Sequence, residues 1–353
     1  MKQAHRISES LMPLHLPGLA GNNKSKLILA GDVGGTKTNL GVFEKEGTKL
    51  IRGASATYQS SAYESVIDIL NEFCKTNQLI IDTVCLGVAG PVIDGKVELT
   101  NLSWDLDAQD IMDKLKISRV YLLNDLEATA YGLAGMQEED FICIHEGKSS
   151  VGGNAAIVAP GTGLGEAGLY WDGSVYHPFP TEGGHCDFCP RSDLDIALLK
   201  YLQNLYGVVS WEKLISGPAI PDIYAFLLTH HNRVSSSEMI EQLRKKDKSA
   251  VISKSAIEQT DQTSVETMEL FVRYLARESS NLVLKMKAVG GLFLGGGIPP
   301  KIAPLLQNKL FHAEFMDCDR MQHLLEEVSI RIIMNQKAPM MGAAYYGAFN
   351  DAD

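Results

Sequence analysis

The chain has 353 residues, of which 45% are hydrophobic and 21% charged, a composition that excludes a disordered or fibrous protein and a length that suits two medium-sized domains. Its formal net charge of -11 argues against a nucleic-acid or anionic-membrane partner, because both favour clustered Lys and Arg. No apolar run reaches the roughly 20 residues of a bilayer crossing, and six scattered Cys with no recognisable secretory leader favour reduced thiols, so we expect a cytoplasmic protein with no membrane or nucleic-acid partner.

Residues 1–26 contain Pro13, Pro17 and several Gly, Asn and Ser, with no sustained alternation of apolar and polar positions. This pattern predicts a flexible N-terminal extension. A mitochondrial transit peptide would be Arg-rich and clearly amphipathic, whereas this segment has one Arg, so we do not expect a targeting sequence.

The next part of the chain alternates short strands with helices. Apolar patterns predict strands at Lys26–Asp32 and Thr38–Glu44, joined by the hairpin turn Gly34–Lys37. Helical spacing follows over 62–77, and a buried strand follows at Thr83–Val88. A strand pair, a helix and another strand in this order are typical of an α/β domain.

A second helix is predicted at Leu106–Leu115, then a strand at Arg119–Leu123 that leads into Asn124 and Asp125, then a helix from Leu126 to Leu133. Asp125 is therefore expected at a junction between a strand and a helix. In open α/β sheets, ligands bind at the carboxyl ends of the strands, so this junction is a candidate site.

The second half of the chain repeats the design of two strands around a glycine turn, at 154–158 and 166–171, and then becomes rich in helices. Helical spacing is found at 192–206, 221–231 and 263–289, whereas residues 234–250 are polar and charged. The last predicted elements are a strand at Leu292–Leu294 and a small-residue helix from Met341 onward, with the apolar segment Arg331–Met334 between them.

The first glycine hairpin has the residue types of a phosphate-binding loop. Glycines let backbone N–H groups approach phosphate oxygens, hydroxyl groups add donors, and Asp32 is placed to hold Mg²⁺ through water. The alternative is an ordinary glycine-rich turn, but an Asp before it and a Thr after it favour the functional interpretation. The predicted nucleotide contacts are Gly34, Gly35, Thr36, Lys37 and Thr38.

The second glycine hairpin, Gly161–Gly165, lacks the Lys-Ser/Thr of a Walker loop, and no Rossmann spacing of glycines opens a helix here. Together with the Gly295–Gly297 turn, the chain has three loops that could each touch one part of ATP, two for phosphates and the last for adenosine. The predicted contacts are Gly161, Thr162, Gly163, Gly295, Gly296 and Gly297.

These loops, with the polar segments between them, resemble the motifs of bacterial glucokinases of the hexokinase and actin-like ATPase superfamily, from about Leu27 to the C-terminus. The matching segments in chain order are Asp32–Thr36, Leu123–Asp125, Gly161–Gly165, Glu182–His185, Ser210–Glu212 before Ser216–Pro218, and Gly295–Gly297. The resemblance implies two actin-like (ribonuclease H-like) α/β domains with an interdomain cleft, and commonly a homodimer.

The domains implied by the resemblance are a small α/β domain at 27–135, joined by the C-terminal helix 336–353, and a large α/β domain at 136–335. The resemblance also makes Asp125 the general base that accepts the proton of the attacking sugar hydroxyl. The alternative for Asp125 is a helix N-cap, because it follows a strand and precedes a helix.

By the same resemblance, Asn124, Asp125, Glu182, His185 and Glu212 bind the sugar. Carboxylates accept hydrogen bonds, an imidazole can donate them and an amide does both, so several hydroxyl groups can be paired at once. A structural role for His185 is the alternative. Cys186 and Cys189 form a C-x-x-C beside His185, but no matching Cys pair follows, so we do not expect zinc there.

The implied activity is transfer of the γ-phosphate of ATP, with Mg²⁺, to the 6-hydroxyl of D-glucose, giving glucose 6-phosphate and ADP at the entry to glycolysis. One rival is a kinase for another hexose or an amino sugar. Another is a non-catalytic sugar-sensing regulator on the same fold, which is disfavoured because no helix-turn-helix region is recognisable before Leu27 and Asp125 is intact.

Overall fold

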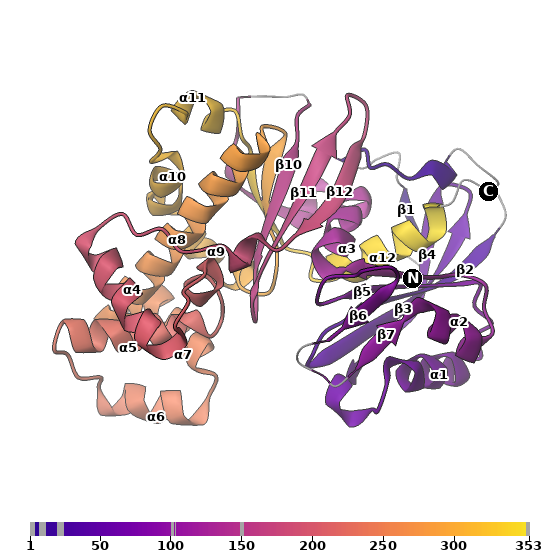
Figure 1. Ribbon diagram of the computed structural model, residues 1–353, viewed down its shortest axis with the longest axis horizontal. Helices are drawn as coiled ribbons and strands as arrows, with labels where there is room; N and C mark the ends of the chain where they lie inside the picture. The colour runs from indigo at the N-terminus through magenta and orange to yellow at the C-terminus, as the bar shows by residue number, and fades with distance from the viewer. Residues whose placement is uncertain are drawn as a thin grey trace. The chain divides into compact units, whose positions relative to one another are not determined.

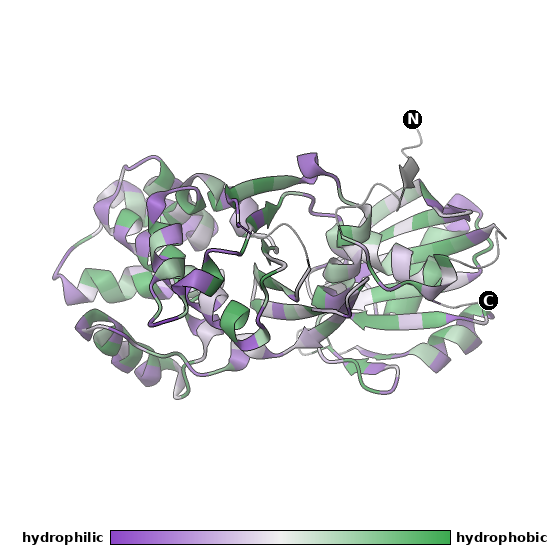
Figure 2. Ribbon diagram, turned by 90° about the horizontal axis from the view of Figure 1, so that it is seen from above, coloured by the Kyte–Doolittle hydropathy of each residue, from purple (hydrophilic) through white to green (hydrophobic). Residues whose placement is uncertain are grey.

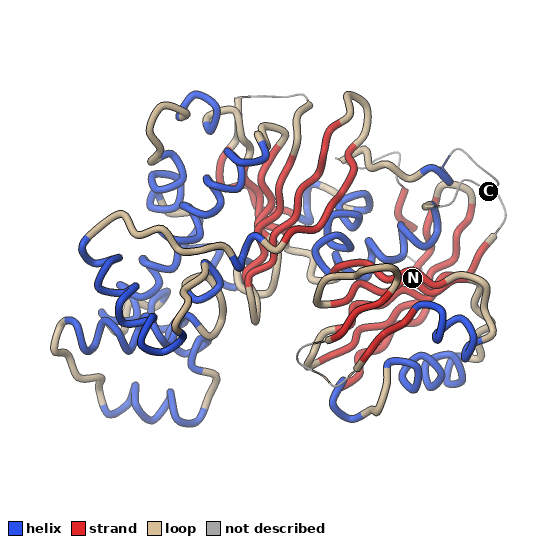
Figure 3. The backbone as a smooth tube through the Cα atoms, viewed as in Figure 1, coloured by secondary structure: helices blue, strands red, loops and turns tan. Residues whose placement is uncertain are grey.

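The computed structural model describes residues 4–6, 12–19, 25–99, 102, 104–148 and 152–350. Contacts divide the chain into two compact units. Unit 1 comprises residues 1–140, 169–180 and 335–353, and unit 2 comprises residues 141–168 and 181–334. Strands and helices alternate in both units, so the predicted α/β class is confirmed (Figures 1 and 3). None of the helices in the described part of the chain is long and apolar enough to cross a membrane.

The sheet of unit 1 has the strand order β1-β4-β3-β2-β5-β8 among the described residues. Its strands are β1 (Ala4–Arg6), β2 (Lys26–Val33), β3 (Lys37–Glu46), β4 (Lys49–Gln59), β5 (Thr83–Val88) and β8 (Val120–Asn124). β2, β5 and β8 are parallel, and their register aligns Asp32 with Gly87 and Gly87 with Leu123. The carboxyl ends of β2 and β8 therefore lie at the same edge of this sheet, which is where parallel sheets bind ligands.

Helices cover both faces of this sheet because its central strands are apolar on both sides. On one face, Val84 and Leu86 of β5 join a core with α1 (Val66–Asn77) and α2 (Ala108–Leu115). On the other face, Cys85 and Ile28 contact Gly347 of α12 (Ala338–Phe349). A short antiparallel pair, β6 (Lys96–Glu98) and β7 (Asp105–Asp107), precedes α2.

Helix caps set where these helices begin. Ser65 forms a capping box with Asp68 at the start of α1, and Asp107 accepts a hydrogen bond from the backbone of Gln109 at the start of α2. Both devices satisfy backbone N–H groups that a helix leaves without partners in its first turn. The predicted helix over 62–77 is therefore shorter than expected and begins at Val66.

Two glycines let α12 pack tightly on α3 (Asp125–Gly132). A Cβ added at Gly342 would lie 1.7 Å from the carbonyl oxygen of Ala128, and one at Gly132 would lie 2.3 Å from that of Ala338. Such distances require a glycine on each helix where the backbones meet. α3 carries Asp125 at its first position, so this contact helps to fix the candidate catalytic residue.

The N-terminal segment differs from the predicted flexible extension. Met12, Leu14 and Leu16 are buried, and backbone hydrogen bonds of 2.8 Å join Tyr176 to Pro13 and His15 to Tyr176. The apolar residues recur at every second position, which is the pattern of an extended segment packed on one side. Residues 12–19 are thus ordered against unit 1, whereas residues 1–3, 7–11 and 20–24 lie outside the described residues.

The second sheet has the order β12-β11-β10-β13-β14-β9 in the described part of the chain. Its strands are β9 (Phe141–His145), β10 (Ala155–Pro160), β11 (Leu164–Trp171), β12 (Tyr176–Thr181), β13 (Gly291–Leu294) and β14 (Ile330–Ile333). β10 and β13 are parallel and pair Val158 with Leu294, so the glycine segments that follow both strands emerge at the same edge.

The helical part of unit 2 packs around α8 (Gln262–Met286), a 25-residue helix that contributes Phe271, Tyr274 and Leu275 to the core. Its helices alternate hydrophobic and hydrophilic positions (Figure 2), as expected for helices with one face in a core. The others are α4 (Asp193–Tyr206), α5 (Ala219–His230), α6 (Ser237–Lys245), α7 (Lys248–Ile257), α9 (Ala303–Leu306), α10 (Lys309–Met316) and α11 (Gln322–Leu325).

Candidate active site

The glycine hairpin of unit 1 is held by Ser60, a residue that the sequence analysis did not select. The Ser60 hydroxyl donates to the carbonyl of Gly34 at 2.8 Å, and its N–H donates to the carbonyl of Thr36 at 3.1 Å. The hairpin also closes on itself through a 3.0 Å hydrogen bond from the Gly34 N–H to the carbonyl of Lys37. Thr36 and Lys37 are exposed at its tip, together with the partly exposed Gly35.

The prediction that Thr38 offers its hydroxyl to a phosphate is corrected by the structure. Thr38 is fully buried, and its hydroxyl forms a 3.0 Å hydrogen bond with that of Ser60. Position 38 alternates with the exposed Lys37 on β3, so its side chain points into the protein. Thr38 therefore organises the hairpin from beneath.

Asp32 lies one residue before the end of β2 and accepts a 3.1 Å hydrogen bond from the side-chain amide of Asn39. Burial raises the pKa of Asp32, and the hydrogen bond from Asn39 opposes that shift. A single carboxylate beside a phosphate loop fits Mg²⁺ that arrives with a nucleotide, because Mg²⁺ keeps several waters and needs few protein ligands. The described residues contain no group of three or more His, Cys, Asp or Glu side chains that could hold a metal ion.

Asn124, and not Asp125, caps α3. The side-chain oxygen of Asn124 accepts hydrogen bonds from the N–H groups of Leu126 and Glu127, and its amide donates to the carbonyl of Gly90 at 3.2 Å. Asn124 is buried, and its side-chain amide mainly serves the structure. Of its two amide N–H groups, one donates to Gly90, so only the other is left for the predicted hydrogen bond to the sugar.

Asp125 occupies the first position of α3 and is half-buried. Its carboxylate accepts a 2.9 Å hydrogen bond from the N–H of Leu126, and Gly87 on the neighbouring strand gives α3 room to pack, because a Cβ there would lie 2.9 Å from Ala128 Cβ. Removing the Asp125 carboxylate would therefore spare the helix cap, because Asn124 provides it. In unit 1 the structure places Asp32, the hairpin and Asp125 along one edge of the sheet.

In unit 2, the glycine hairpin after β10 opens onto a cavity of about 820 Å³. Gly161, Thr162 and Gly297 line it, so loops predicted to bind the phosphates and the adenosine meet in one space. The cavity volume lies within the range of small-molecule and cofactor sites.

The rest of the cavity wall comes from residues that the sequence analysis did not select. The apolar part includes Ile220, Ile257, Ile298 and Ile302, and the polar part includes Lys248, Ser249, Ser253, Lys254 and Lys301 together with the carboxylates Asp247 and Glu258. Helix α7 supplies much of this wall. From the sequence, only the first residues of α7 were described, as part of the polar and charged segment 234–250. Apolar side chains with a few hydroxyl and ammonium groups suit a flat base attached to an anionic chain.

Gly295 and Gly296 shape the loop that carries Gly297, although neither lines the cavity. Gly296 has a φ of +78°, and a Cβ there would lie 2.5 Å from the carbonyl oxygen of Pro160. Gly295 and Gly296, predicted to contact adenosine, therefore form the turn, and Gly297 is the glycine of this segment that lines the cavity.

The sugar-binding candidates of unit 2 lie on two adjoining turns. Glu182 and His185 flank the turn at Gly183–His185, with a separation of 4.0 Å between His185 Nε2 and Glu182 Oε2. Glu212 lies on the turn Trp211–Lys213, and a 2.9 Å backbone hydrogen bond from Trp211 to Cys186 joins the two turns. Glu182 and His185 are exposed, whereas Glu212 is mostly covered.

Glu212 is held in place by the glycine hairpin Gly161–Gly165. Its Oε2 accepts a 3.1 Å hydrogen bond from the N–H of Leu164, and a Cβ added at Gly163 would lie 2.5 Å from the same oxygen. Gly163 was predicted to contact a nucleotide, but the structure shows that it also makes room for a sugar-binding candidate. The hydrogen bond between Leu164 and Glu212 therefore links the hairpin directly to the predicted sugar site of unit 2.

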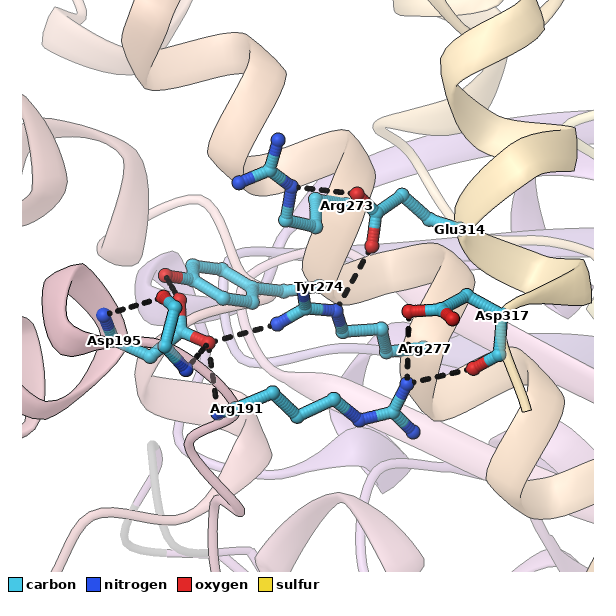
Figure 4. Close-up of polar contacts among 8 residues, drawn as sticks. Arg191, Asp195, Arg273, Tyr274, Arg277, Glu314 and Asp317 are labelled. Carbon is cyan, nitrogen blue, oxygen red and sulfur yellow. Dashed lines mark hydrogen bonds and ion pairs between the residues drawn. The ribbon is translucent and has the colours of Figure 1, made fainter. Parts of the chain in front are cut away.

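A buried ion-pair network anchors the segment that follows His185 (Figure 4). Asp195 near the start of α4 accepts hydrogen bonds from the backbone of Arg191, the hydroxyl of Tyr274 at 3.0 Å and the guanidinium of Arg277 at 2.8 Å. Arg277 also bonds Glu314 at 3.0 Å. Because Asp195 is fully buried and Arg277 is 7% exposed, this pair excludes water and holds the loop to α8.

Cys186 and Cys189 are exposed free thiols. The expectation that they bind no zinc stays a prediction, and elemental analysis of the purified protein is its direct check.

The comparisons with known proteins agree with this geometry. A family model described as Glucokinase matches residues 29–349. The glucokinase of Nostoc punctiforme is 36% identical over 337 residues, which cover 91% of this chain and 99% of that protein. The chain belongs to the glucokinase family.

Solved glucokinase structures share the fold. A glucokinase from an Antarctic psychrotroph superimposes with a TM-score of 0.77 at 26% identity and covers 91% of this chain and 98% of that one. A ROK family glucokinase of Streptomyces griseus, solved with glucose and AMPPNP, has a TM-score of 0.60 at 19% identity over 91% and 99% of the two chains. The predicted actin-like fold of two α/β domains is thereby confirmed.

Proposed function

We propose that this chain is an ATP-dependent glucokinase that transfers the γ-phosphoryl group of ATP to the 6-hydroxyl of D-glucose, giving glucose 6-phosphate and ADP. Membership of the glucokinase family carries the proposal, and the presence of two glycine hairpins and of Asp125 directly after β8 supports it. The Streptomyces griseus relative was solved with glucose and a nucleotide analogue, which is consistent with the same pair of ligands.

Asp125 accepts the proton of the sugar hydroxyl in this proposal. Its hydrogen bond from the Leu126 N–H holds the carboxylate in a defined position, and α3 is locked onto α12 by Gly132 and Gly342. A general base must be held within hydrogen-bond reach of the proton that it removes, so rigid support of this kind favours catalysis.

The nucleotide binds through the two hairpins and the unit 2 cavity in this proposal. Backbone N–H groups of Gly34–Lys37 and of Gly161–Gly163 contact the phosphates, and the isoleucine-lined wall holds the base. Asp32 would hold Mg²⁺ through water, and the ion would neutralise charge on the phosphates. Phosphoryl transfer depends chiefly on such alignment and charge neutralisation.

Glu182, His185 and Glu212 bind the sugar hydroxyls in this proposal, with a smaller share from Asn124. Their carboxylates and imidazole would remain unpaired with an analogue that lacks a hydroxyl, which gives selectivity. A coupled assay with ATP and a panel of hexoses and amino sugars tests the substrate. The highest kcat/KM is expected for glucose, and a clear preference for another sugar would replace glucose in the proposal.

Replacing Gly163 by Ala should raise KM for glucose, because the added methyl would displace the Glu212 carboxylate that the Leu164 N–H holds. Loss of one such contact is expected to cost about tenfold in KM. Gly161→Ala is the matched variant in the same hairpin, since a Cβ there meets no protein atom within 4 Å. Steady-state kinetics with glucose varied should separate the two, and an equal glucose KM in both would contradict this role of Gly163.

We also propose that the enzyme works in the cytoplasm at the entry to glycolysis and forms a homodimer. The absence of a membrane-spanning helix from the described residues is compatible with the location. Leu205 near the end of α4 and Val208 after it are exposed apolar side chains that a partner subunit could cover. Light scattering of the purified protein tests the dimer.

A further inference from the structure

Glu166 of β11 is a buried carboxyl group with no assigned role. It is 1% exposed, and neither of its carboxyl oxygens has a hydrogen-bond partner within the part of the chain that the structure describes. Burying an ionised carboxylate without partners is strongly unfavourable, so the surroundings of Glu166 must keep its charge small or balance it. Glu166 also lies next to the predicted sugar-binding segment Glu182–His185, so its charge can affect the position of that segment.

The side chain of Glu166 lies directly against the turn that carries Glu182 and His185. A Cβ added at Gly183 would be 2.0 Å from Glu166 Oε2. The Thr181 hydroxyl donates to the Glu166 carbonyl at 3.1 Å and accepts from the Gly183 N–H at 3.3 Å. Thr181 and Gly183, the residues on both sides of Glu182, therefore both contact Glu166.

Among the described residues, the charged groups that act on Glu166 are Glu278 and Lys285 of α8. Glu278 is fully buried and accepts hydrogen bonds from Asn281 at 2.8 Å and from Lys285 at 3.4 Å. Burial first, and then the negative charge of Glu278, raise the pKa of Glu166 to about 8, while Lys285 opposes the shift. From β12 and the sugar turn, Thr181 and Gly183 add no charge. Glu166 is therefore mostly protonated at neutral pH.

We propose that Glu166 is a positioning residue for the hexose, which holds the Glu182–His185 segment in place through its contact with Gly183. The inference rests on the proposed function, because it takes these two side chains as sugar ligands. When Glu166 loses its proton, a negative charge arises beside the buried Glu278 carboxyl, whose own pKa is also raised by burial. Movement of the Gly183 turn would admit water to the new charge, and it would carry Glu182 and His185 out of register with the sugar.

The pH dependence of KM for glucose tests this inference. If only the protonated form binds glucose well, KM should rise up to about tenfold from pH 7 to pH 9, because the competent fraction falls tenfold per unit above the pKa. KM for ATP should not follow this rise. Glu166→Gln keeps the shape without the charge, so its glucose KM should stay flat over the same range. Parallel KM profiles in the wild type and Glu166→Gln would overturn the inference.

Glu182→Gln distinguishes a failure of the inference from a failure of the sugar-site assignment. If this variant leaves KM for glucose unchanged at pH 7, the assignment of the sugar segment is wrong, and the inference falls with it. If Glu182→Gln raises KM but Glu166→Gln does not flatten the pH profile, the sugar site stands and the inference alone is wrong.

A pair of substitutions gives a second test that does not depend on pH. Gly183→Ala should raise KM for glucose, because its methyl group would collide with Glu166. In a Glu166→Ala background the collision is gone, so the added Gly183→Ala change should have a much smaller effect on KM. Equal effects in the two backgrounds would mean that Glu166 does not act through Gly183.

Discussion

Replacing Asp125 by Asn is expected to lower kcat by roughly 100- to 10,000-fold, because an amide cannot accept the proton of the sugar hydroxyl. The fold should be spared, since Asn124 supplies the cap of α3 and the amide at position 125 keeps the shape of the carboxylate. Binding of MgATP should also persist. The measurement is kcat and KM for glucose, with circular dichroism as the check on folding.

Glu212→Gln is the comparison variant for Asp125→Asn. In the proposed mechanism it removes a sugar contact and leaves the general base, so KM for glucose should rise while kcat changes much less. If instead Glu212→Gln lowered kcat strongly and Asp125→Asn only raised KM for glucose, the general base would be Glu212 or a neighbour in unit 2. Near-normal kcat in Asp125→Asn would show that another group removes the proton.

Replacing Arg277 by Met should destabilise the protein by about 3–5 kcal/mol, because Asp195 would remain buried without its guanidinium partner. Urea denaturation followed by circular dichroism measures the loss. Glucose binding should weaken as well, since Asp195 anchors the loop after His185.

Arg273→Met is the matched control for Arg277→Met. Arg273 lies one turn earlier on α8 and pairs with the same Glu314 at 2.9 Å, but its side chain is 31% exposed, so its loss should cost less than about 1 kcal/mol. Equal losses in the two variants would contradict a special role for the buried pair.

The destabilisation by Arg277→Met should also depend on pH. Burial opposes ionisation of Asp195, but hydrogen bonds from Arg191, Arg277 and Tyr274 outweigh it and lower the pKa of Asp195. A lowered pKa contributes stability above the unfolded value of about 4, and that stability is lost as the pH falls through the folded value. The difference between the wild type and Arg277→Met should therefore be largest at neutral pH and shrink below about pH 4.

The elements with the strongest local patterns were predictable from the sequence. β5 is buried along its whole length and was predicted with its observed bounds, and the glycine hairpins marked the ends of β2 and β10. β4 was missed because only Leu50 of its eleven residues is buried, so it lacks the apolar alternation that identifies a strand. A strand of this kind forms because it pairs with its neighbours β1 and β3, and such pairing cannot be read from a single sequence.

In the candidate site, too, residues with a local sequence signal could be predicted and residues that depend on distant contacts could not. Motif residues such as Asp125 and Gly161 could be selected because their types and spacing carry chemistry. The α7 wall of the cavity, Ser60 beneath the first hairpin and Glu166 against Gly183 could not, since they depend on contacts between segments far apart in the chain. The burial of Thr38 was also missed, although the alternation of side chains along a strand next to a Lys residue could have indicated it.

The identity of the phosphorylated product tests the central claim most directly. The purified chain is incubated with MgATP and D-glucose, and the products are identified by phosphorus NMR and quantified by coupled enzymes. We predict equal amounts of ADP and glucose 6-phosphate, with Asp125→Asn forming neither at a comparable rate. Release of ADP without a sugar phosphate, or a phosphate on another hydroxyl of glucose, would contradict the account.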